Sequence, residues 1–564
     1  MWSWFVDVLR HHPELALFLT LASGYWIGKV RIGSVLLGPV VGVLLVGTLV
    51  GQLGVTVSSD LKTAFFLLFL FSIGYRTGPQ FFSGLKASGF PQIALTFVFC
   101  LTALGLTYAA ARVFGYDVGT AGGLMGGATT ESAAVGTATD AINRLGLDPA
   151  QARSLLTNVA VAFAVTYLLA VLTNIAFLSR VAPRILKVDL AAECAALEKS
   201  MGVVSEAATA TGYRVFSFRA YRAEGENLVG KTVRSVEQES LERGQRLLIP
   251  RLRHGGRISE TTPETAIQRG DVVAVAGRRA GVIAAQAAIG PELDDKELLD
   301  LDVDSIEVVV TEKSIVGLSL GEFVRRAGPD FIRGVGLRRI LRAGAELPLT
   351  WGTRLARGDV LTLVGIPEEL ARVAGSIGYV DRATNTTEMA MVAAAIFVGG
   401  LVGIPALRLG GLELGLSESV GVLLGGLVLG WLRSVNRRIP RLPDAVVALF
   451  DSLGLTAFLA ATALAAGPDF VRGLRHSGLS LLLAGIAIVI VPQLVTLLAG
   501  KFVFRMHPGI LLGVCCGAGT SAPALAAVQE VARSKIPTLG YGVTYAVGNV
   551  LLALWGSLIV ALVR

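Results

Sequence analysis

The chain has 564 residues, of which 53% are hydrophobic and only 16% are charged. A soluble globular protein carries roughly 25% charged residues, so this composition excludes an ordinary soluble enzyme as well as disordered, collagen-like and disulfide-scaffold proteins. The charges are also unevenly placed, because 58 of the 92 charged residues (50 basic and 42 acidic) lie in positions 180–388. The sequence therefore predicts two apolar membrane blocks that flank one normally charged segment.

The first block, 1–180, contains five continuous apolar runs, each long enough to cross a bilayer core of about 30 Å. The expected membrane spans are 14–30, 33–51, 61–77, 91–113 and 155–179. A sixth, shorter segment at 119–140 is rich in Gly, Ala and Thr and is weaker as a spanning helix. We expect it to form a re-entrant, broken-helix hairpin.

The middle segment has a different period. Short β-rich stretches such as DVLTLVG (359–365) are bounded by Gly and charged residues. One pattern also occurs twice, because RGDVVAVAGRR (269–279) matches RGDVLTLVGIP (357–367). We therefore expect two small α+β domains, over 200–292 and 304–382.

The second block, 388–564, repeats the first. Four matching pairs occur in the same order: VGVLLVGTLVG (41–51) with VGVLLGGLVLG (420–430), TGPQFFSGLKASG (77–89) with AGPDFVRGLRHSG (466–478), GGATTESAAVG (126–136) with CGAGTSAPALA (516–526), and FAVTYLLAVL (163–172) with YAVGNVLLAL (545–554). This pattern indicates internal duplication. The expected spans are 389–407, 417–432, 444–466, 479–500 and 538–562, with a second hairpin at 509–530. Gly78-Pro79 and Gly467-Pro468 are interpreted as helix stops.

Lys and Arg residues set the expected orientation. With residue 1 outside and five spans plus one hairpin in each block, 15 of them fall on the cytoplasmic side and 9 outside, as the positive-inside rule requires. An odd number of spans gives the two blocks opposite orientations, which is the usual plan of secondary transporters. The sequence therefore predicts a polytopic α-helical membrane protein with two inverted repeats, a cytoplasmic insert and both termini extracytoplasmic.

The two hairpins carry the candidate substrate-binding residues. Gly and Pro breaks leave helix N-termini inside the membrane, where free N–H groups and partial positive charge suit a carboxylate. The candidates are Gly126, Gly127, Ala128, Thr129, Thr130 and Glu131 in the first hairpin, and Gly517, Ala518, Gly519, Thr520, Ser521 and Pro523 in the second. The alternative is a close-packed helix crossing whose hydroxyl groups bond to their own backbone.

Charged residues inside the apolar blocks are further candidates. Arg76 ends the run FFLLFLFSIGYR, and its planar guanidinium suits a carboxylate, although an interfacial arginine that follows the positive-inside rule is equally compatible. Glu131, Asp140 and Asp451 could carry a proton, pair with Arg76 or form a polar gate. For Asp140 and its counterpart Glu530, a hairpin end in water is the favoured interpretation.

Other chemistries lack a sequence signal. The sequence shows no nucleophile elbow, Walker loop or metal-ligand spacing, so we expect no enzyme activity, cofactor or metal site. No basic cluster alternates with aromatic residues, so we expect no nucleic-acid partner. The expected partners are the lipid bilayer and a small carboxylate or amino-acid substrate.

Taken together, these residues resemble the aspartate:alanine exchanger family of bacterial antiporters. The resemblance rests on GYRTGPQFF (74–82), on GAGTSAPALAA (517–527), on the weaker match YAVG (545–548), and on the order of the parts. The middle domains, with their LVGKT and RGDV elements, look like the TrkA-C or RCK-C regulatory domains of potassium-transport proteins.

The resemblance implies exchange of external L-aspartate for internal L-alanine across the bacterial cytoplasmic membrane. It suggests a homodimer in which a transport domain that bears the hairpins moves against a scaffold, with a possible regulatory ligand at the middle domains. Arg76 falls on the family's arginine, which favours a role in binding the substrate carboxylate. Glu131 makes the first hairpin more acidic than the family pattern, so a bound anion requires this carboxyl to be protonated or turned away.

The alternative function is a ligand-gated ion transporter or channel, regulated by the middle domains. A potassium pathway needs repeated carbonyl-lined loops such as TVGYG. The sequence contains no such repeated loop, and Gly540-Tyr541-Gly542 stands alone before a span. The antiporter is therefore the favoured interpretation.

Overall fold

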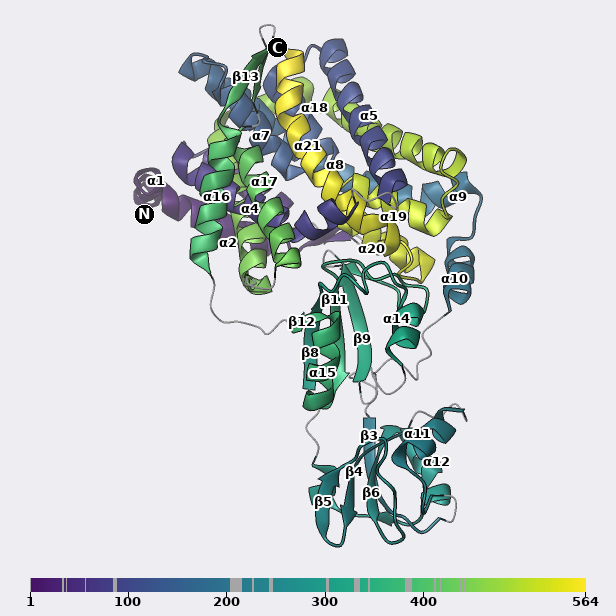
Figure 1. Cartoon of the computed structure of the whole chain (residues 1–564). Coiled ribbons are helices and arrows are strands. Elements are labelled where there is room, and N and C mark those ends of the chain that lie inside the picture. The colour runs from purple at the N-terminus through teal and green to yellow at the C-terminus, as the bar shows by residue number, and fades with distance from the viewer. Residues whose placement is uncertain are drawn as a thin grey trace. The chain divides into compact units, whose positions relative to one another are not determined.

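The chain folds into two compact units in the computed structural model (Figure 1). A helical unit contains Met1–Ala196 and Ala383–Arg564, and an insert contains Leu197–Arg382. The structure describes residues 2–564 except 33–34, 37, 56, 85–88, 203–215, 226–227, 243–246, 301–303, 329–334, 343–344, 381–387, 410–411, 416, 437–438 and 440–441.

The first half of the helical unit contains two short strands among its helices. The elements are α1 (Trp2–His11), α2 (Pro13–Ile27), β1 (Arg31–Ile32), β2 (Val35–Leu36), α3 (Pro39–Gly51), α4 (Ser59–Gly84), α5 (Phe90–Phe114), α6 (Val118–Ala128), α7 (Ser132–Asn143), α8 (Pro149–Ala176), the π-helical turn η2 (Phe177–Val181), α9 (Ala182–Leu186) and α10 (Leu190–Met201).

The second half shows the same series. Its elements are α16 (Met389–Gly403), β13 (Ala406–Leu409), β14 (Leu412–Gly415), α17 (Glu418–Val435), α18 (Asp444–Phe502), α19 (Pro508–Ala518), α20 (Ala522–Ala532) and α21 (Thr538–Val563). Equivalent pairs also touch in both halves, because α2 packs on α3 as α16 packs on α17, and α6 packs on α8 as α19 packs on α21.

Glycines allow the first of these repeated contacts. A Cβ added at Gly42 in α3 would collide with the backbone of Gly24 in α2. A Cβ added at Gly421 in α17 would collide in the same way with the backbone of α16, at Gly399. Small residues let apolar helices approach to backbone contact, which explains part of the high Gly content of the sequence.

Six helical segments in the described part of the chain are long and apolar enough to cross a membrane. They are Phe90–Phe114, Pro149–Leu186, Glu418–Val435, Asp444–Ala465, Gly478–Phe502 and Thr538–Val563. These coincide with six of the ten expected spans. The segments α2, α3 and α16 have only 15, 13 and 15 residues, fewer than the roughly 20 of a full crossing.

Two of the expected spans are longer than the helices that the structure contains there. The spans at 33–51 and 389–407 include strand residues, because β1 pairs with β2 before α3 begins, and β13 pairs with β14 after α16 ends. The strand residues inside these two ranges, Val35–Leu36 and residues 406–407 (Ala-Leu), are as apolar as the neighbouring helices, so hydropathy alone does not separate them.

The interpretation of the two Gly-Pro pairs as helix stops is wrong. Helix α4 continues through Gly78-Pro79, and α18 continues through Gly467-Pro468. A Cβ at Gly78 would collide with the backbone of α17, and one at Gly467 would lie 2.5 Å from the backbone of α3. These glycines therefore serve close helix packing. Membrane helices tolerate an internal proline such as Pro79 when neighbouring groups satisfy the freed carbonyl.

Helix α18 has 59 residues, which correspond to a length of about 88 Å if it is straight. That length is about three times the bilayer core, so α18 supplies two crossings. Its first segment packs at Gly454 against Phe65 and Phe69 of α4. Its second segment packs at Gly485 against Thr166 of α8.

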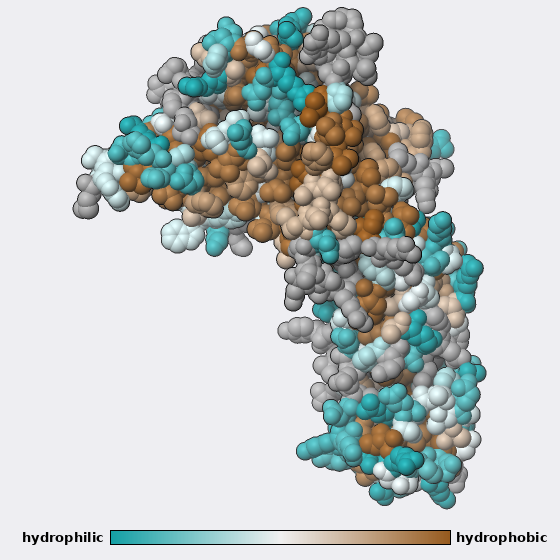
Figure 2. Space-filling view, turned by 60° about the vertical axis from the view of Figure 1, so that its left-hand side comes forward, coloured by the Kyte–Doolittle hydropathy of each residue, from teal (hydrophilic) through white to brown (hydrophobic). Residues whose placement is uncertain are grey.

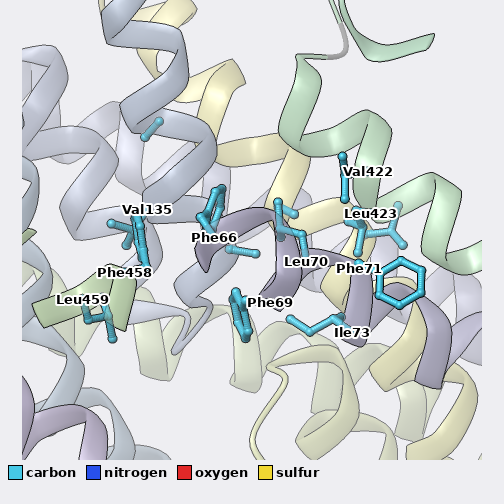
Figure 3. Packing of buried hydrophobic residues seen from close by; sticks show 14 of the residues in the cluster. Phe66, Phe69, Leu70, Phe71, Ile73, Val135, Val422, Leu423, Phe458 and Leu459 are labelled. Carbon is cyan, nitrogen blue, oxygen red and sulfur yellow. The ribbon is translucent and has the colours of Figure 1, made fainter. Parts of the chain in front are cut away.

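The largest hydrophobic cluster joins the first hairpin to α4, α17 and α18 (Figure 3). The rings of Phe66 and Phe458 have centroids 4.5 Å apart, and Val135 of α7 packs beside them. Gly136 follows Val135, and a Cβ there would collide with the ring of Phe66. The first hairpin is therefore held against α4 by close packing that tolerates no larger residue.

Exposed large hydrophobic side chains are concentrated on the helical unit (Figure 2). Trp26, Val113, Phe397 and Leu479 are each at least 68% exposed. Among the described residues of the insert, Ile283 is the large hydrophobic side chain in this exposed class. Such a surface needs an apolar solvent, so the helical unit is that of a multi-pass membrane protein.

The insert contains two five-stranded antiparallel sheets, ordered β5-β4-β6-β3-β7 and β10-β9-β11-β8-β12. Both orders describe the same topology. The elements are β3 (Phe216–Arg222), α11 (Val233–Glu242), β4 (Leu248–His254), β5 (Arg257–Glu260), β6 (Val272–Arg278), α12 (Arg279–Ile289), β7 (Glu292–Leu293), α13 (Lys296–Leu299), β8 (Asp304–Val310), α14 (Leu320–Ala327), β9 (Val335–Arg342), β10 (Ala345–Glu346), β11 (Val360–Gly365), α15 (Pro367–Ile377) and β12 (Gly378–Val380).

Candidate functional site

Both expected hairpins are broken helices. The first breaks between α6 and α7 at Thr129–Glu131, and the second breaks between α19 and α20 at Gly519–Ser521. Thr130 and Thr520 occupy the same place in the two breaks and have positive φ values of 56° and 49°. A β-branched residue rarely adopts this conformation, so both breaks place their threonine under backbone strain.

Backbone hydrogen bonds close the two breaks in the same way. The Glu131 N–H donates to the carbonyl of Gly126, and the Ser521 N–H donates to that of Cys516, both at 2.9 Å. Glu131 then caps α7 by accepting from the Ala133 N–H at 3.1 Å, and the Ser521 hydroxyl caps α20 by accepting from the Ala524 N–H. The N-termini of α7 and α20 therefore begin inside the helical unit, as the sequence indicates.

The two breaks bind each other. The Thr130 hydroxyl donates to the Gly519 carbonyl at 3.2 Å, and the Thr520 hydroxyl donates to the Thr129 carbonyl at 3.4 Å. Because Thr129 corresponds to Gly519 and Thr130 to Thr520, these two bonds are equivalent. The alternative, in which hydroxyl groups bond to their own backbone, describes Thr129, which donates to the Met125 carbonyl, and Ser521, which caps α20, but it does not describe Thr130 or Thr520.

The candidate residues of both hairpins lie together around this contact. Thr129, Glu131 and Ser521 are buried, whereas Thr130 and Thr520 are half-buried. The remaining buried candidates are small residues of the two hairpins: Gly126, Gly127, Ala128, Gly517, Ala518 and Gly519. Pro523 is exposed on α20 and stands apart from the buried set.

Two further glycines pack identically. A Cβ at Gly127 would collide with the hydroxyl of Thr166 in α8, and a Cβ at Gly517 would collide with the hydroxyl of Thr544 in α21. This equivalence aligns Thr166 with Thr544, so VTY at 165–167 corresponds to VTY at 543–545. The alignment of 163–172 with 545–554 is therefore four residues out of register.

Arg76 is paired. Its Nη2 lies 3.1 Å from Oδ2 of Asp451 in α18, with the two side chains 37% and 31% exposed. Pairing with Asp451 is one of the three roles that the sequence leaves open for this acid. Arg76 is therefore not an unpaired arginine that extends to the membrane interface, because an ion pair with another helix fixes the position of its guanidinium.

Two tyrosines interact electrostatically both with this ion pair and with the first hairpin break. Tyr541 and Tyr545 of α21 stack with their ring centroids 5.0 Å apart. Both interact electrostatically with Arg76 and with Glu131. The sequence analysis missed them as site residues. The repeated VTY pattern was the available signal, since Phe163 and Tyr167 form the corresponding ring pair, 5.1 Å apart, in the first half.

Comparison with known proteins places these parts in a family. A family model described as a predicted permease membrane region, the aspartate:alanine exchanger model, matches residues 16–183 and 391–561. The chain belongs to the aspartate:alanine exchanger family. The matched ranges cover both halves of the helical unit of this exchanger-family member and leave the insert outside.

Relatives of this exchanger-family chain match it from end to end. An uncharacterized transporter of Shewanella oneidensis is 37% identical over 99% of both chains. An uncharacterized transporter of Bradyrhizobium diazoefficiens is 40% identical over 92% of this chain and 100% of the relative. One from Bordetella parapertussis is 38% identical over 98% of both chains. No solved structure matches the chain.

The outer acids of the two hairpins, Asp140 and Glu530, differ from each other. Glu530 is exposed, as expected. Asp140, in contrast, is half-buried rather than exposed, and it accepts a hydrogen bond from the hydroxyl of Ser419 in α17. Its interpretation as a hairpin end in water is therefore wrong. Lys62 of α4 also lies near Asp140 and interacts with it electrostatically. The first hairpin is therefore attached to α4 and α17 at its far end as well as at Phe66.

Proposed function

We propose that the protein is a secondary-active antiporter that exchanges small carboxylates or amino acids, with L-aspartate and L-alanine as the first candidates. Membership of the exchanger family and relatives named as transporters support a transport role. The observation that carries the proposal is the mutual hydrogen bonding of the two broken hairpins through Thr130 and Thr520. Broken helices that meet inside a membrane unit are typical of transporter substrate sites.

The electrostatics of the hairpin contact suit an anion. The N-termini of α7 and α20 carry partial positive charge from their helix dipoles, and the contact draws both breaks together. Arg76 adds a full positive charge near the same region, because Tyr541 and Tyr545 interact electrostatically both with Arg76 and with Glu131. A dicarboxylate such as aspartate can place one carboxylate at a helix N-terminus and the other at the guanidinium.

Asp451 and Glu131 set conditions on this binding mode. A substrate carboxylate that approaches Arg76 must share the guanidinium with Asp451, whose carboxylate already occupies Nη2. Glu131 is buried and caps α7 with one oxygen. In this proposal Asp451 holds the arginine in place between transport cycles. Glu131 also hydrogen-bonds to the Thr520 side chain of the second hairpin, so it is protonated when the anion binds beside it.

The arrangement of the helices supports an elevator mechanism within two inverted repeats. One group of contacts joins α4 to α17 and to the first segment of α18. A second group joins the hairpins to α5, α8, α21 and the second segment of α18. The second group would move against the first, and this requires the packing of the first hairpin on Phe66 of α4 and its hydrogen bond from Ser419 of α17 to open during transport. Both termini would lie outside and the insert in the cytoplasm. A homodimer, and a regulatory ligand at TrkA-C-like domains of the insert, complete the proposal.

Counterflow in proteoliposomes tests the function. Vesicles that contain the purified protein and are loaded with L-alanine should take up labelled L-aspartate, and empty vesicles should not. Arg76→Ala should abolish this uptake, whereas Arg112→Ala, at an exposed arginine that ends α5, should retain it. Absence of uptake for every amino and dicarboxylic acid tried would contradict the antiporter, and normal uptake by Arg76→Ala would remove the arginine from the site.

A further inference from the structure

A buried pair of amide side chains lies behind the second hairpin. Gln493 of α18 is 1% exposed, and Asn174 of α8 is 4% exposed. Gln493 Nε2 donates to Asn174 Oδ1 at 3.1 Å and to the Cys515 carbonyl of α19 at 3.2 Å. The pair therefore joins three helices inside the helical unit, and none of its atoms enters the binding mode described above.

The orientation of the Gln493 amide follows from its partners. A backbone carbonyl only accepts hydrogen bonds, so the group that faces Cys515 must be the NH2 of Gln493. The Oε1 atom then faces away, and it is buried with no hydrogen-bond partner among the described residues. A buried acceptor without a donor destabilises the fold, unless something else donates to it.

The amide pair lies directly against the hairpin break. A Cβ added at Gly519 would be 2.9 Å from Gln493 Nε2 and 3.6 Å from Asn174 Nδ2. Gly519 is also the residue whose carbonyl accepts the Thr130 hydroxyl. The amides and the contact between the two hairpins therefore share one residue.

The other half of the unit has no amide at this place. The offset between the repeats aligns Gln493 with Leu104 of α5, and the VTY register aligns Asn174 with Leu552 of α21. Leu104 and Leu552 lie together in one hydrophobic cluster. Since two leucines satisfy the packing there, the fold does not require polar side chains at this position.

We propose that Gln493 recognises the ammonium group of an amino-acid substrate through its free Oε1, and that Asn174, which accepts from Gln493 Nε2, positions the amide. An ammonium supplies three N–H donors and no acceptor, which is the complement of an unsatisfied amide oxygen. A substrate carboxylate at the adjacent helix N-termini lies on the same molecule, and the two groups together define an α-amino acid. This inference rests on the proposed function, and it makes the site selective for amino acids over plain dicarboxylates.

The test compares L-aspartate with succinate, which has the two carboxylates and lacks the amino group. Unlabelled aspartate and succinate compete with labelled aspartate for uptake into alanine-loaded proteoliposomes. The wild type should prefer aspartate, and Gln493→Leu, which introduces the residue of the equivalent position, should reduce this preference roughly tenfold or more. The change should come from weaker aspartate binding, with succinate little affected.

Gln92→Leu is the matched control. Gln92 of α5 also has a buried Oε1 without a partner among the described residues, but its Nε2 faces the carbonyl of Leu539, at the start of α21. This variant should retain the wild-type preference. If Gln493→Leu does not fold, Gln493→Met removes the same oxygen with a side chain of similar length and provides the same comparison.

The possible results separate the two proposals. An unchanged aspartate-to-succinate ratio in a folded Gln493 variant overturns the inference, because the amide oxygen then binds only water. A wild type that prefers succinate also overturns it and leaves the antiporter intact. A wild type that takes up neither compound, while protein incorporation into the vesicles is normal, contradicts the proposed function and the inference together.

Discussion

Arg76 Nη2 and Asp451 Oδ2 lie 3.1 Å apart and join α4 to α18 across the helical unit. The repeat places Lys62 at the position of Asp451, and Ala465 at that of Arg76. The position equivalent to Asp451 therefore carries a positive charge, and the position equivalent to Arg76 carries no charge. The ion pair therefore joins the two halves at one of two equivalent positions and is not repeated at the other, where Lys62 and Ala465 stand.

Replacing Asp451 with Asn should lower aspartate uptake several-fold. A partly exposed ion pair contributes up to about 1 kcal/mol, so the loss of positioning corresponds to roughly fivefold. Because both residues act through one contact, the double variant Arg76→Ala/Asp451→Asn should unfold at no lower temperature than Arg76→Ala alone. Labelled aspartate counterflow measures Asp451→Asn, and thermal unfolding measures the double variant and both single variants. Independent, additive losses would show that the two residues act separately.

Thr130 and Thr520 should respond alike to substitution. Thr130→Val and Thr520→Val each remove one hydroxyl that bonds to the opposite hairpin, and each should destabilise the contact by about 1 kcal/mol. The Ser variants keep the hydroxyl and should behave like the wild type. Thermal unfolding and uptake of the four single variants can be compared directly. A large effect at one threonine and none at the other would contradict the equivalence of the two bonds.

Gly127→Ala should strongly destabilise the helical unit. The added methyl group would collide with the Thr166 hydroxyl, and the surrounding backbone of α8 gives it little space. Adding Thr166→Ala should restore part of the loss. The control is Gly105→Ala, at a glycine of α5 with open space around its Cβ position, where the change should be neutral or slightly stabilising. Equal unfolding temperatures for the two single variants would contradict this packing argument.

The hairpin breaks could be predicted from sequence because their residues are locally decisive. Gly127 and Gly517, and Thr130 and Thr520, stand at corresponding places in the two repeats and limit where a helix can continue, and the structure breaks at Thr129–Glu131 and Gly519–Ser521. The same local reasoning was wrong at Gly78-Pro79. There the glycine is required by the approach of α17, which is a contact between distant parts of the sequence.

The contents of the site depend on such distant contacts. Arg76 and Asp451 are 375 positions apart, and their pairing depends on how α4 and α18 are rotated about their axes. The amide pair of Asn174 and Gln493 is likewise set by the packing of α8 on α18. Neither Asn174 nor Gln493 lies in a recognisable sequence motif, so only the three-dimensional arrangement reveals the pair.

Arg342→Ala should destabilise the second sheet of the insert by about 3 kcal/mol or more. Asp359 is fully buried and receives two hydrogen bonds from the Arg342 guanidinium, at 2.8 and 2.7 Å, so its carboxylate would lose its counter-charge in the interior. In the first sheet His254 bonds to Asp271 at the equivalent place, but the His254 side chain is 58% exposed. His254→Ala should therefore cost less. Hydrogen exchange of the two sheets in the full-length protein would compare them, and a larger loss of protection with His254→Ala would contradict the expectation.

Glu322 should make the stability of α14 depend on pH. It forms a capping box with Ser319, and the hydrogen bond from the Ser319 backbone N–H, followed by that from its side chain, lowers the pKa of Glu322 below its ordinary value. A lowered folded-state pKa contributes stability that is fully present above the unfolded pKa of about 4.3 and is lost as pH falls through the folded value. Glu322→Gln keeps a capping side chain without the charge, so it should remove this acid dependence and change little at neutral pH. Hydrogen exchange of α14 in the full-length protein, corrected for intrinsic rates and followed from pH 7 towards pH 3, measures both variants. Equal slopes in the wild type and Glu322→Gln would assign the acid dependence to other groups.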